Sequence, residues 1–409
     1  MLLLRTMLHD LPKVPFNLMD PAYTQDPYSF LEPMRDTAPV YQWEAGGGPV
    51  FMRWADCSAL LRDPRLGLDP TFGQGMPAEI QMHFPDFAAM RNNDLLLSSP
   101  QAHARMRKLL NPIFGPRAVE VHKAKVEQII GALLDKMPSE GIVNVAMDYA
   151  RQYPVRVIAA ILHIPDGYEQ EFLAFADSLI ATIVPGMAPE RFAACMPPIS
   201  RGMAITRELI AERRKNPIEN DLMTQLIHAC DEDERLSEPE LVSLVGGLIV
   251  GGSDTTTHLT GNVLLELHRN LEQLALLRKD PSLARNALDE TLRYTTFGRT
   301  FLPRYVLEPF TQNGIDLEVG KPIYLATSAA FRDKDFAPDA NVYDITRRHT
   351  GSPWFGFGPH FCLGASLARL EAERAVQMFF EKYPHTELAG EPEYGNHPIF
   401  RNLVNVPIR

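Results

Sequence analysis

The chain has 409 residues, and its 40 basic and 51 acidic side chains give it a formal net charge of -11. This acidic excess argues against a general nucleic-acid binder, which needs a basic footprint. Hydrophobic residues make up 45% of the chain and charged residues 22%, which is typical of a globular protein with an ample core. Collagen-like and disordered chains are excluded by the same composition.

Neither the cysteines nor the apolar segments indicate export or a membrane anchor. The four cysteines are widely separated and form no CxxC pair, so no disulfide framework is expected. Only three consecutive leucines precede Arg5, which is too short for a secretory signal. The longest apolar stretch, Leu241–Gly252, falls below the roughly 20 residues that span a bilayer. We therefore expect a cytoplasmic protein, a monomer that binds neither a membrane nor nucleic acid.

Helical periodicity dominates the chain. The predicted helices are Gln101–Leu110, Ala118–Lys136, Met147–Leu162, Tyr168–Ile180, Ile199–Lys215, Glu238–Arg269, Leu271–Lys279, Ser282–Tyr294 and Ala365–Lys382. The predicted strands are Val50–Arg53, Phe301–Val306, Pro322–Thr327 and Leu403–Ile408. Two intervals without a clear pattern, Pro70–Ser99 and Val184–Pro198, are predicted as long loops. The sequence thus predicts a mainly α fold with a small β region, in a single domain over residues 1–409.

The segment Gly351–Gly364, GSPWFGFGPHFCLG, places Cys362 directly before a predicted helix. Backbone N–H groups and the helix dipole at that position favour a thiolate. Three functional interpretations are open. A zinc site needs four ligands, and only His360 lies nearby. A nucleophilic cysteine needs a base with an orienting partner. A thiolate ligand to haem iron needs this kind of loop and one open iron face.

The predicted helix Glu238–Arg269 is rich in glycine, which costs a helix roughly 1 kcal/mol per residue relative to alanine. Gly247, Gly251 and Thr255 recur every four residues and therefore share one face of the helix. Such a bare face lets another group approach the helix closely.

The spacing Phe355–x–x–Gly358–x–x–x–Cys362–x–Gly364 resembles the haem-binding loop of the cytochrome P-450 haem-thiolate monooxygenases. The resemblance implies the fold of that family, a single helix-rich domain with haem b (iron protoporphyrin IX) between the long central helix and the cysteine loop. It also implies that Cys362 is the axial iron ligand, with Phe355, Gly358 and Gly251 against the cofactor.

Further positions match the family in chain order. Asp254 and Thr255 resemble its acid–alcohol pair, which delivers protons during oxygen activation. Glu290, Arg293 and Arg347 resemble its Glu–Arg–Arg network, which braces the loop before the cysteine.

The haem propionates need cationic donors, for which arginine is well suited. The resemblance assigns them to His103, Arg107, His360 and Arg304. Arg299 is an alternative to Arg304, or it projects into the substrate pocket. After Tyr294 the family often has a proline where this chain has Thr295–Thr296–Phe297, so the substrate-facing positions there are left open.

The resemblance implies insertion of one oxygen atom of O2 into a hydrophobic small molecule by hydroxylation or epoxidation. Similarity to bacterial members that tailor macrolides suggests a macrolide, another polyketide or a fatty-acid-like substrate. No flavin or nicotinamide motif is present, so electrons should come from a ferredoxin or flavodoxin and an NAD(P)H-dependent reductase. The alternatives are a haem protein that binds or senses without oxygenating, and a haem-free cysteine hydrolase. The predicted substrate pocket comprises Gly247, Val250, Gly251, Phe297, Arg299 and Val404, with parts of Pro70–Leu97 and Val184–Met196.

Overall fold

The computed structural model describes residues 8–69, 71, 75–183, 187–231, 234–349, 355–397 and 399–409. Within these ranges the chain forms two compact units. The first draws on Met1–Phe72, Asp289–Phe361 and Tyr394–Asn402, and the second on Gly73–Leu288, Cys362–Glu393 and Leu403–Arg409. The chain passes repeatedly from one unit to the other, and a single domain over residues 1–409 stays a prediction.

The first unit contains a five-stranded sheet with the order β1-β2-β10-β7-β3. Its strands are Val40–Trp43, Gly48–Phe51, Pro322–Leu325, Leu302–Val306 and Leu66–Gly67 in that order. The pairing is antiparallel except between β2 and β10. A Cβ at Gly48 would lie 2.1 Å from the Pro322 carbonyl oxygen, so glycine permits the close approach of these two strands.

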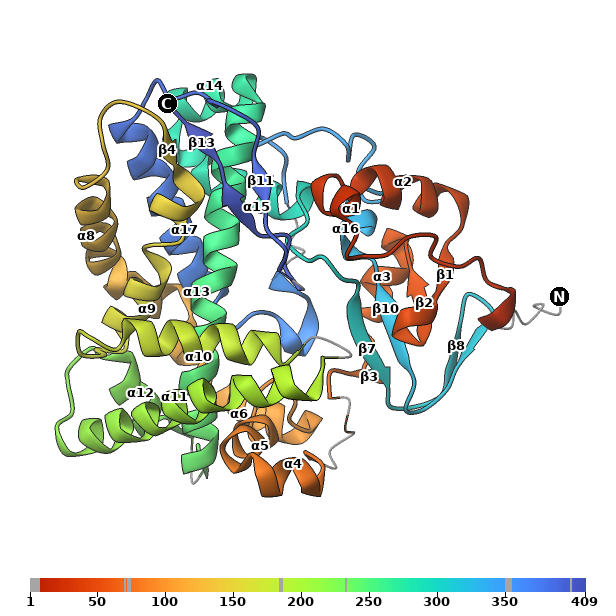
Figure 1. Cartoon of the computed structure of the whole chain (residues 1–409), viewed down its shortest axis with the longest axis horizontal. Helices are drawn as coiled ribbons and strands as arrows, with labels where there is room; N and C mark the ends of the chain where they lie inside the picture. Colours follow the sequence, from red (N-terminus) through yellow and green to blue (C-terminus); the bar gives the residue numbers. More distant parts are fainter. Residues whose placement is uncertain are drawn as a thin grey trace. The chain divides into compact units, whose positions relative to one another are not determined.

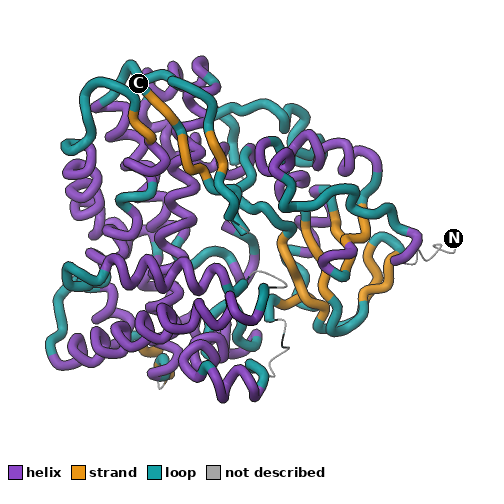
Figure 2. Tube along the Cα trace, viewed as in Figure 1, coloured by secondary structure: helices purple, strands orange, loops and turns teal. Residues whose placement is uncertain are grey.

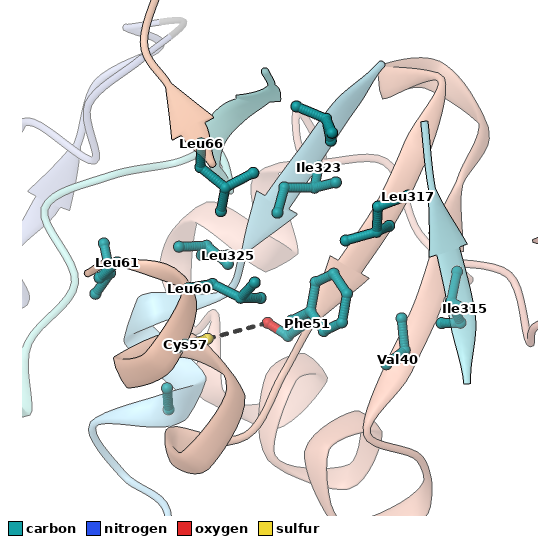
Figure 3. Packing of buried hydrophobic residues seen from close by; sticks show 12 residues of the cluster. Val40, Phe51, Cys57, Leu60, Leu61, Leu66, Ile315, Leu317, Ile323 and Leu325 are labelled. Atoms are coloured by element: carbon teal, nitrogen blue, oxygen red, sulfur yellow. Dashed lines mark hydrogen bonds between the residues drawn. The ribbon is translucent and has the colours of Figure 1, made fainter. Parts of the chain in front are cut away.

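One face of this sheet packs against α3 (Trp54–Leu60), as Figure 3 shows. Phe51 and Leu325 point from the strands toward Leu60 and Cys57 on the helix, and all four are buried. The Cys57 thiol donates a hydrogen bond to the Phe51 carbonyl over 3.3 Å. Cys57 is therefore a core residue. The unit also holds short elements at its edges: α1 (Pro21–Gln25), α2 (Tyr28–Thr37), α16 (Thr327–Ala330) and the hairpin of β8 (Phe310–Gln312) and β9 (Ile315–Leu317).

The second unit is a bundle of helices around α13 (Glu238–Arg269), the long green helix of Figure 1. The helix begins where Ser237 and Glu240 form a reciprocal capping box, and it ends at Asn270. Helices α9 (Pro154–Ile161), α10 (Glu169–Ala181), α11 (Pro189–Lys215) and α17 (Ala365–Lys382) pack against it. The helices of this unit dominate Figure 2. The remaining larger helices are α6 (Pro100–Phe114), α8 (Lys123–Leu134), α12 (Leu222–His228), α14 (Leu271–Lys279) and α15 (Ala284–Tyr294), which continues into the first unit.

Several predicted boundaries were wrong. Pro70–Ser99 was predicted as a loop, but it contains α4 (Ala78–His83) and α5 (Pro85–Asn92). The loop predicted over Val184–Pro198 is helical from Pro189, because α11 continues through Pro197 and Pro198. Residues 70, 72–74 and 184–186 of these intervals lie outside the described residues.

Two predicted elements are divided by proline. The helix predicted over Met147–Leu162 is a π-helical turn, η4 (Val145–Ala150), followed by α9. Pro154 starts α9 at the position where a missing N–H costs nothing. The strand predicted over Leu403–Ile408 is two short strands, β12 (Leu403–Asn405) and β13 (Pro407–Ile408). In the described part of the chain, no helix is long and apolar enough to cross a bilayer.

Candidate active site

Cys362 lies just before α17, and Gly364 is the N-cap of that helix. Although the residue is exposed, burial of its sulfur raises the pKa of the thiol. Backbone N–H groups of Gly364 and Ala365 and the charges of Arg107 and Arg369 act in the opposite direction. The backbone N–H groups therefore favour the thiolate, as the sequence predicts, but burial outweighs them in the free side chain.

The loop before Cys362 owes its shape to two glycines in the left-handed region. Gly356 has a φ of 77° and Gly358 a φ of 66°, which other residues rarely adopt. Phe355 is buried, and its ring centroid is 6.4 Å from that of Phe361. His360 is half-buried at the end of a short turn over Gly358–His360. Residues 351–354 of the motif lie outside the described residues.

The glycine face of α13 is exposed in the middle of an otherwise buried helix. Gly247, Gly251 and Thr255 are exposed and Val250 is half-buried, whereas Gly246, Ile249, Ser253 and Thr256 on the other side of the helix are buried. Outside the backbone of the helix itself, no atom of the described residues lies within 4 Å of a Cβ added at Gly247 or Gly251. The Thr255 hydroxyl donates a hydrogen bond to the Gly251 carbonyl. This face therefore leaves room for a group that the chain itself does not supply.

Asp254 is half-buried on the same helix. Burial raises the pKa of its carboxyl, the charge of Asp177 raises it further, and Arg151 lowers it. The carboxyl thus holds a proton more readily than an exposed aspartate, as a proton donor requires.

His103 and Arg107 are one turn apart on α6, within the second unit. His103 is buried, and burial together with the charge of Arg107 lowers the pKa of its imidazole. Burial also lowers the pKa of the half-buried Arg107, and the charge of Cys362 partly offsets this effect. The structure therefore brings the predicted propionate donor Arg107 close to the predicted axial ligand.

In the first unit, Arg304 and Arg299 are both buried but differ in their partners. Arg304 donates one hydrogen bond, to the Pro303 carbonyl at 2.8 Å, and has no carboxylate partner among the described residues. Burial lowers the pKa of its guanidinium to about 10. Arg299 instead donates to Asn396 Oδ1 at 3.0 Å, to the His397 carbonyl at 2.9 Å and to the Thr24 hydroxyl. A buried arginine without an anion, such as Arg304, is suited to bind one.

The predicted Glu–Arg–Arg network is formed within the first unit. Glu290 contacts Arg293 at 2.7 Å and Arg347 at 3.3 Å. His349 Nε2 lies 3.3 Å from Glu290 Oε2, a contact that sequence reasoning missed. Burial by itself raises the pKa of Glu290, but the hydrogen bonds from Arg293 and the close contact with His349 outweigh it and hold the pKa at about 2. Glu290 is therefore an ionised anchor for the segment that leads toward the cysteine loop.

The remaining predicted pocket residues are distributed between the two units. Phe297, which is buried, and Arg299 belong to the first unit, and the half-buried Val404 belongs to the second. The assembly of these residues with α13 into one substrate pocket stays a prediction. Sequence reasoning also missed Arg369, which follows Cys362 by two turns, and the two charged neighbours of Asp254.

Within the second unit, two features match the needs of a haem: the bare face at Gly247 and Gly251, and Cys362 held near Arg107. Within the first unit, the buried Arg304, which has no carboxylate partner among the described residues, suits an anionic group such as a propionate. A helix-rich fold with these features is that of a haem-thiolate enzyme.

Comparisons with known proteins support the same class of enzyme. The cytochrome P-450 family model matches residues 78–394. The epothilone C/D epoxidase of Sorangium cellulosum is 34% identical over 400 residues, which cover 97% of this chain and 95% of that protein. The 6-deoxyerythronolide B hydroxylase of Saccharopolyspora erythraea is 31% identical, covering 96% of this chain and 98% of the other. The structure of epothilone B-bound cytochrome P-450epoK matches with a TM-score of 0.89 at 34% identity, covering 96% of this chain and 98% of that one.

The chain therefore belongs to the cytochrome P-450 family. The predicted family, the mainly α fold and the resemblance to polyketide-tailoring members are confirmed. The protein is a monooxygenase of the oxidoreductase class, and its family implies haem, O2, an organic substrate and a redox partner.

Proposed function

We propose that the protein uses haem b, with Cys362 as the axial ligand, to hydroxylate or epoxidise a hydrophobic small molecule. The observation that carries this proposal is the position of Cys362, where two backbone N–H groups and two arginines lie close enough to stabilise a thiolate. Bound haem would supply the oxygen-activating chemistry, and the thiolate would donate electron density to the metal.

The protein's own residues then bind the cofactor and move protons. Arg107 and Arg304, together with His103 and His360, would hold the propionates. Arg304 is preferred to Arg299 because, among the described residues, its guanidinium makes one hydrogen bond, whereas that of Arg299 already has three partners. Asp254 would donate protons, with the Thr255 hydroxyl as the next hydrogen-bonding group along the exposed face. Gly247 and Gly251 leave this face open to cofactor and substrate.

The substrate class rests on the relatives. One acts on epothilones and another on 6-deoxyerythronolide B, so a macrolide or another polyketide is the preferred substrate, with a fatty-acid-like compound second. A ferredoxin or flavodoxin with an NAD(P)H-dependent reductase would supply the electrons.

The decisive experiment compares the carbon-monoxide spectrum of the reduced wild-type protein with that of Cys362→Ser. The wild type is expected to show the red-shifted Soret band of a thiolate-ligated haem, and the variant is expected to lose it. A variant with unaltered spectra would contradict the assignment of Cys362.

A second experiment separates an oxygenase from a haem protein that only binds or senses. A panel of macrolides and fatty acids is screened for substrate-induced spin-state shifts, and compounds that bind are incubated with a reductase system. Oxygenated product at the expense of NAD(P)H supports the proposal. In Thr255→Ala, oxygen is expected to be diverted to peroxide, and fully coupled turnover would refute the role of Thr255.

A further inference from the structure

Several buried arginines in the described part of the chain have no carboxylate to compensate their charge. The buried arginines there are Arg35, Arg213, Arg293, Arg299, Arg304 and Arg401. The first three each pair with an aspartate or a glutamate. The last three donate only to neutral oxygens of the described residues. A buried charge is costly unless it is paired. Arg304 is assigned to a haem propionate above, so Arg299 and Arg401 need another explanation.

Arg299 and Arg401 project from the same face of a short antiparallel contact in the first unit. Gly298 and Phe400 form an isolated antiparallel bridge. The backbone N–H groups of both arginines donate across it to carbonyls of the opposite segment at 2.8 Å. Each arginine directly follows one of the two bridge residues, and side chains alternate between faces, so both lie on the face opposite to Phe400. Such diagonal neighbours are about 7–8 Å apart, within reach of long side chains.

The two guanidiniums meet at Thr24, a buried residue of α1. Arg299 Nη2 donates to the Thr24 hydroxyl. Arg401 Nε donates to the Thr24 carbonyl at 2.6 Å, and its Nη2 donates to the Gln25 carbonyl at 2.7 Å. The other partners of Arg299 are an amide oxygen and a carbonyl. Two positive charges are therefore buried side by side among neutral acceptors.

The acidic groups of this region do not supply the missing negative charge. Burial raises the pKa of the Tyr23 hydroxyl, and the charges of Arg401 and Arg299 only partly offset this effect, so the phenol is neutral at neutral pH. Asp20 and Asp26 are exposed, and each accepts a backbone hydrogen bond near a helix start. Residues 295–303 and 394–402 contain no aspartate or glutamate.

The arginine pair also keeps unused hydrogen-bond donors. A guanidinium has five N–H groups. Arg299 makes its three hydrogen bonds through Nη1 and Nη2, and Arg401 makes two through Nε and Nη2. Arg299 Nε is buried and has no partner in the described part of the chain. Because 3% of Arg299 and 7% of Arg401 are exposed, a group that binds between them must be small.

We propose that Arg299 and Arg401, with Thr24, form a binding site for one small inorganic anion such as chloride. The anion compensates the buried positive charge and accepts hydrogen bonds from N–H groups that the chain leaves unused. It thereby ties α1 to residues 394–402. The site needs neither haem nor substrate, so this inference goes beyond the proposed function.

The first test follows the urea unfolding of the holoenzyme as chloride rises, at an ionic strength kept constant with sodium gluconate, whose anion is too large for the site. Above the dissociation constant, each tenfold rise in chloride should lower the unfolding equilibrium constant of the wild type about tenfold, because only the folded protein binds the ion. Arg401→Met should abolish this dependence.

Arg35→Met is the matched control. Arg35 is 6% exposed and donates to two carbonyls, as Arg401 does, but it also pairs with Asp36 at 3.0 Å. This variant should lose stability and keep the chloride dependence of the wild type.

The second test builds the anion into the chain. Thr24→Asp places a carboxylate where the two guanidiniums meet. At low chloride its unfolding equilibrium constant should be about tenfold or more below that of the wild type, because a charge-assisted hydrogen bond replaces a neutral one. Unfolding of this variant should no longer depend on chloride. A Thr24→Asp variant that is less stable than the wild type and still responds to chloride contradicts the site.

The third test locates the ion. Crystals of the wild-type holoenzyme grown in bromide should show an anomalous peak between Arg299 and Arg401. The inference is overturned if the wild type unfolds independently of chloride, or if Arg401→Met keeps the dependence. It is also overturned by a bromide peak without chloride-dependent stability, since the ion is then adventitious. If a fatty acid replaces chloride as the stabilising anion, the pair holds a substrate carboxylate and the inference is wrong.

Discussion

Glu290 and Arg293 form a two-point ion pair that is completely buried. Arg293 Nε donates to Glu290 Oε2 at 2.8 Å and Nη2 donates to Oε1 at 2.7 Å, and neither side chain is exposed. The guanidinium also donates to the carbonyls of Phe331, Ala340 and Val342. One arginine therefore joins α15 to two distant stretches of the first unit.

Replacing Arg293 with lysine should destabilise the protein. Lysine cannot make both contacts, and breaking a buried pair typically costs about 3–5 kcal/mol. The free energy of unfolding is measured by denaturant titration, alongside the haem-thiolate spectrum. Arg285→Lys is the control, because Arg285 lies 3.6 Å from Glu373 with half of its side chain exposed, and such a pair contributes about 0–1 kcal/mol. If both variants lose the same free energy of unfolding, the buried pair contributes no more to stability than the exposed one.

Glu290 also predicts how stability depends on pH. Its pKa is about 2 in the folded protein against 4.5 as the ordinary value, so its contribution is fully present above about pH 4.5. As pH falls toward about 2 that contribution, on the order of 3 kcal/mol, is lost because the unfolded state binds the proton first. The difference in unfolding free energy between wild type and Glu290→Gln should therefore shrink over this range. If the difference stays constant as pH falls, protonation of Glu290 is not the cause of the loss of stability.

Adjacent glycines on α13 should respond oppositely to alanine. A Cβ at Gly246 would lie 3.0 Å from Phe175 and 3.3 Å from Met90, whereas one at Gly247 would meet no atom of the other described residues within 4 Å. We expect Gly247→Ala to raise the free energy of unfolding by up to about 1 kcal/mol, from helix propensity, and Gly246→Ala to lower it by about 1–3 kcal/mol, from overpacking. Only Gly247→Ala should change the spin-state response to substrate without loss of stability. If both variants are equally destabilised, the face at Gly247 is not open.

Much of the fold could be predicted from local patterns, while several roles in the site could not. The bounds of α13 and α17 were predicted correctly, since α13 has a capping box and both helices have sustained periodicity. The start of α11 was missed, because Pro197 and Pro198 resemble helix breakers and only packing in the folded unit overrides them.

His349 and Asp177 were missed for another reason. Each acts on a residue far away in sequence, Glu290 and Asp254 respectively, and no local pattern encodes that proximity. The choice between Arg299 and Arg304 likewise depended on their partners in the folded chain. Family motifs indicate which residue types take part, but the partners of each side chain are known only from the structure.

The two arginines provide the last prediction. Arg304→Leu should speed the transfer of haem to an apo-globin acceptor about tenfold or more, because a charge-assisted bond to a propionate contributes about 1.5–3 kcal/mol. Its effect on unfolding should be small, since the guanidinium makes one hydrogen bond to the chain. Arg299→Leu should instead lower the free energy of unfolding by about 2–3 kcal/mol, because it leaves Asn396, the His397 carbonyl and Thr24 without their donor. Haem transfer from the folded Arg299 variant should stay near the wild-type rate. The opposite pattern, with fast haem loss from the Arg299 variant alone, would assign the propionate to Arg299.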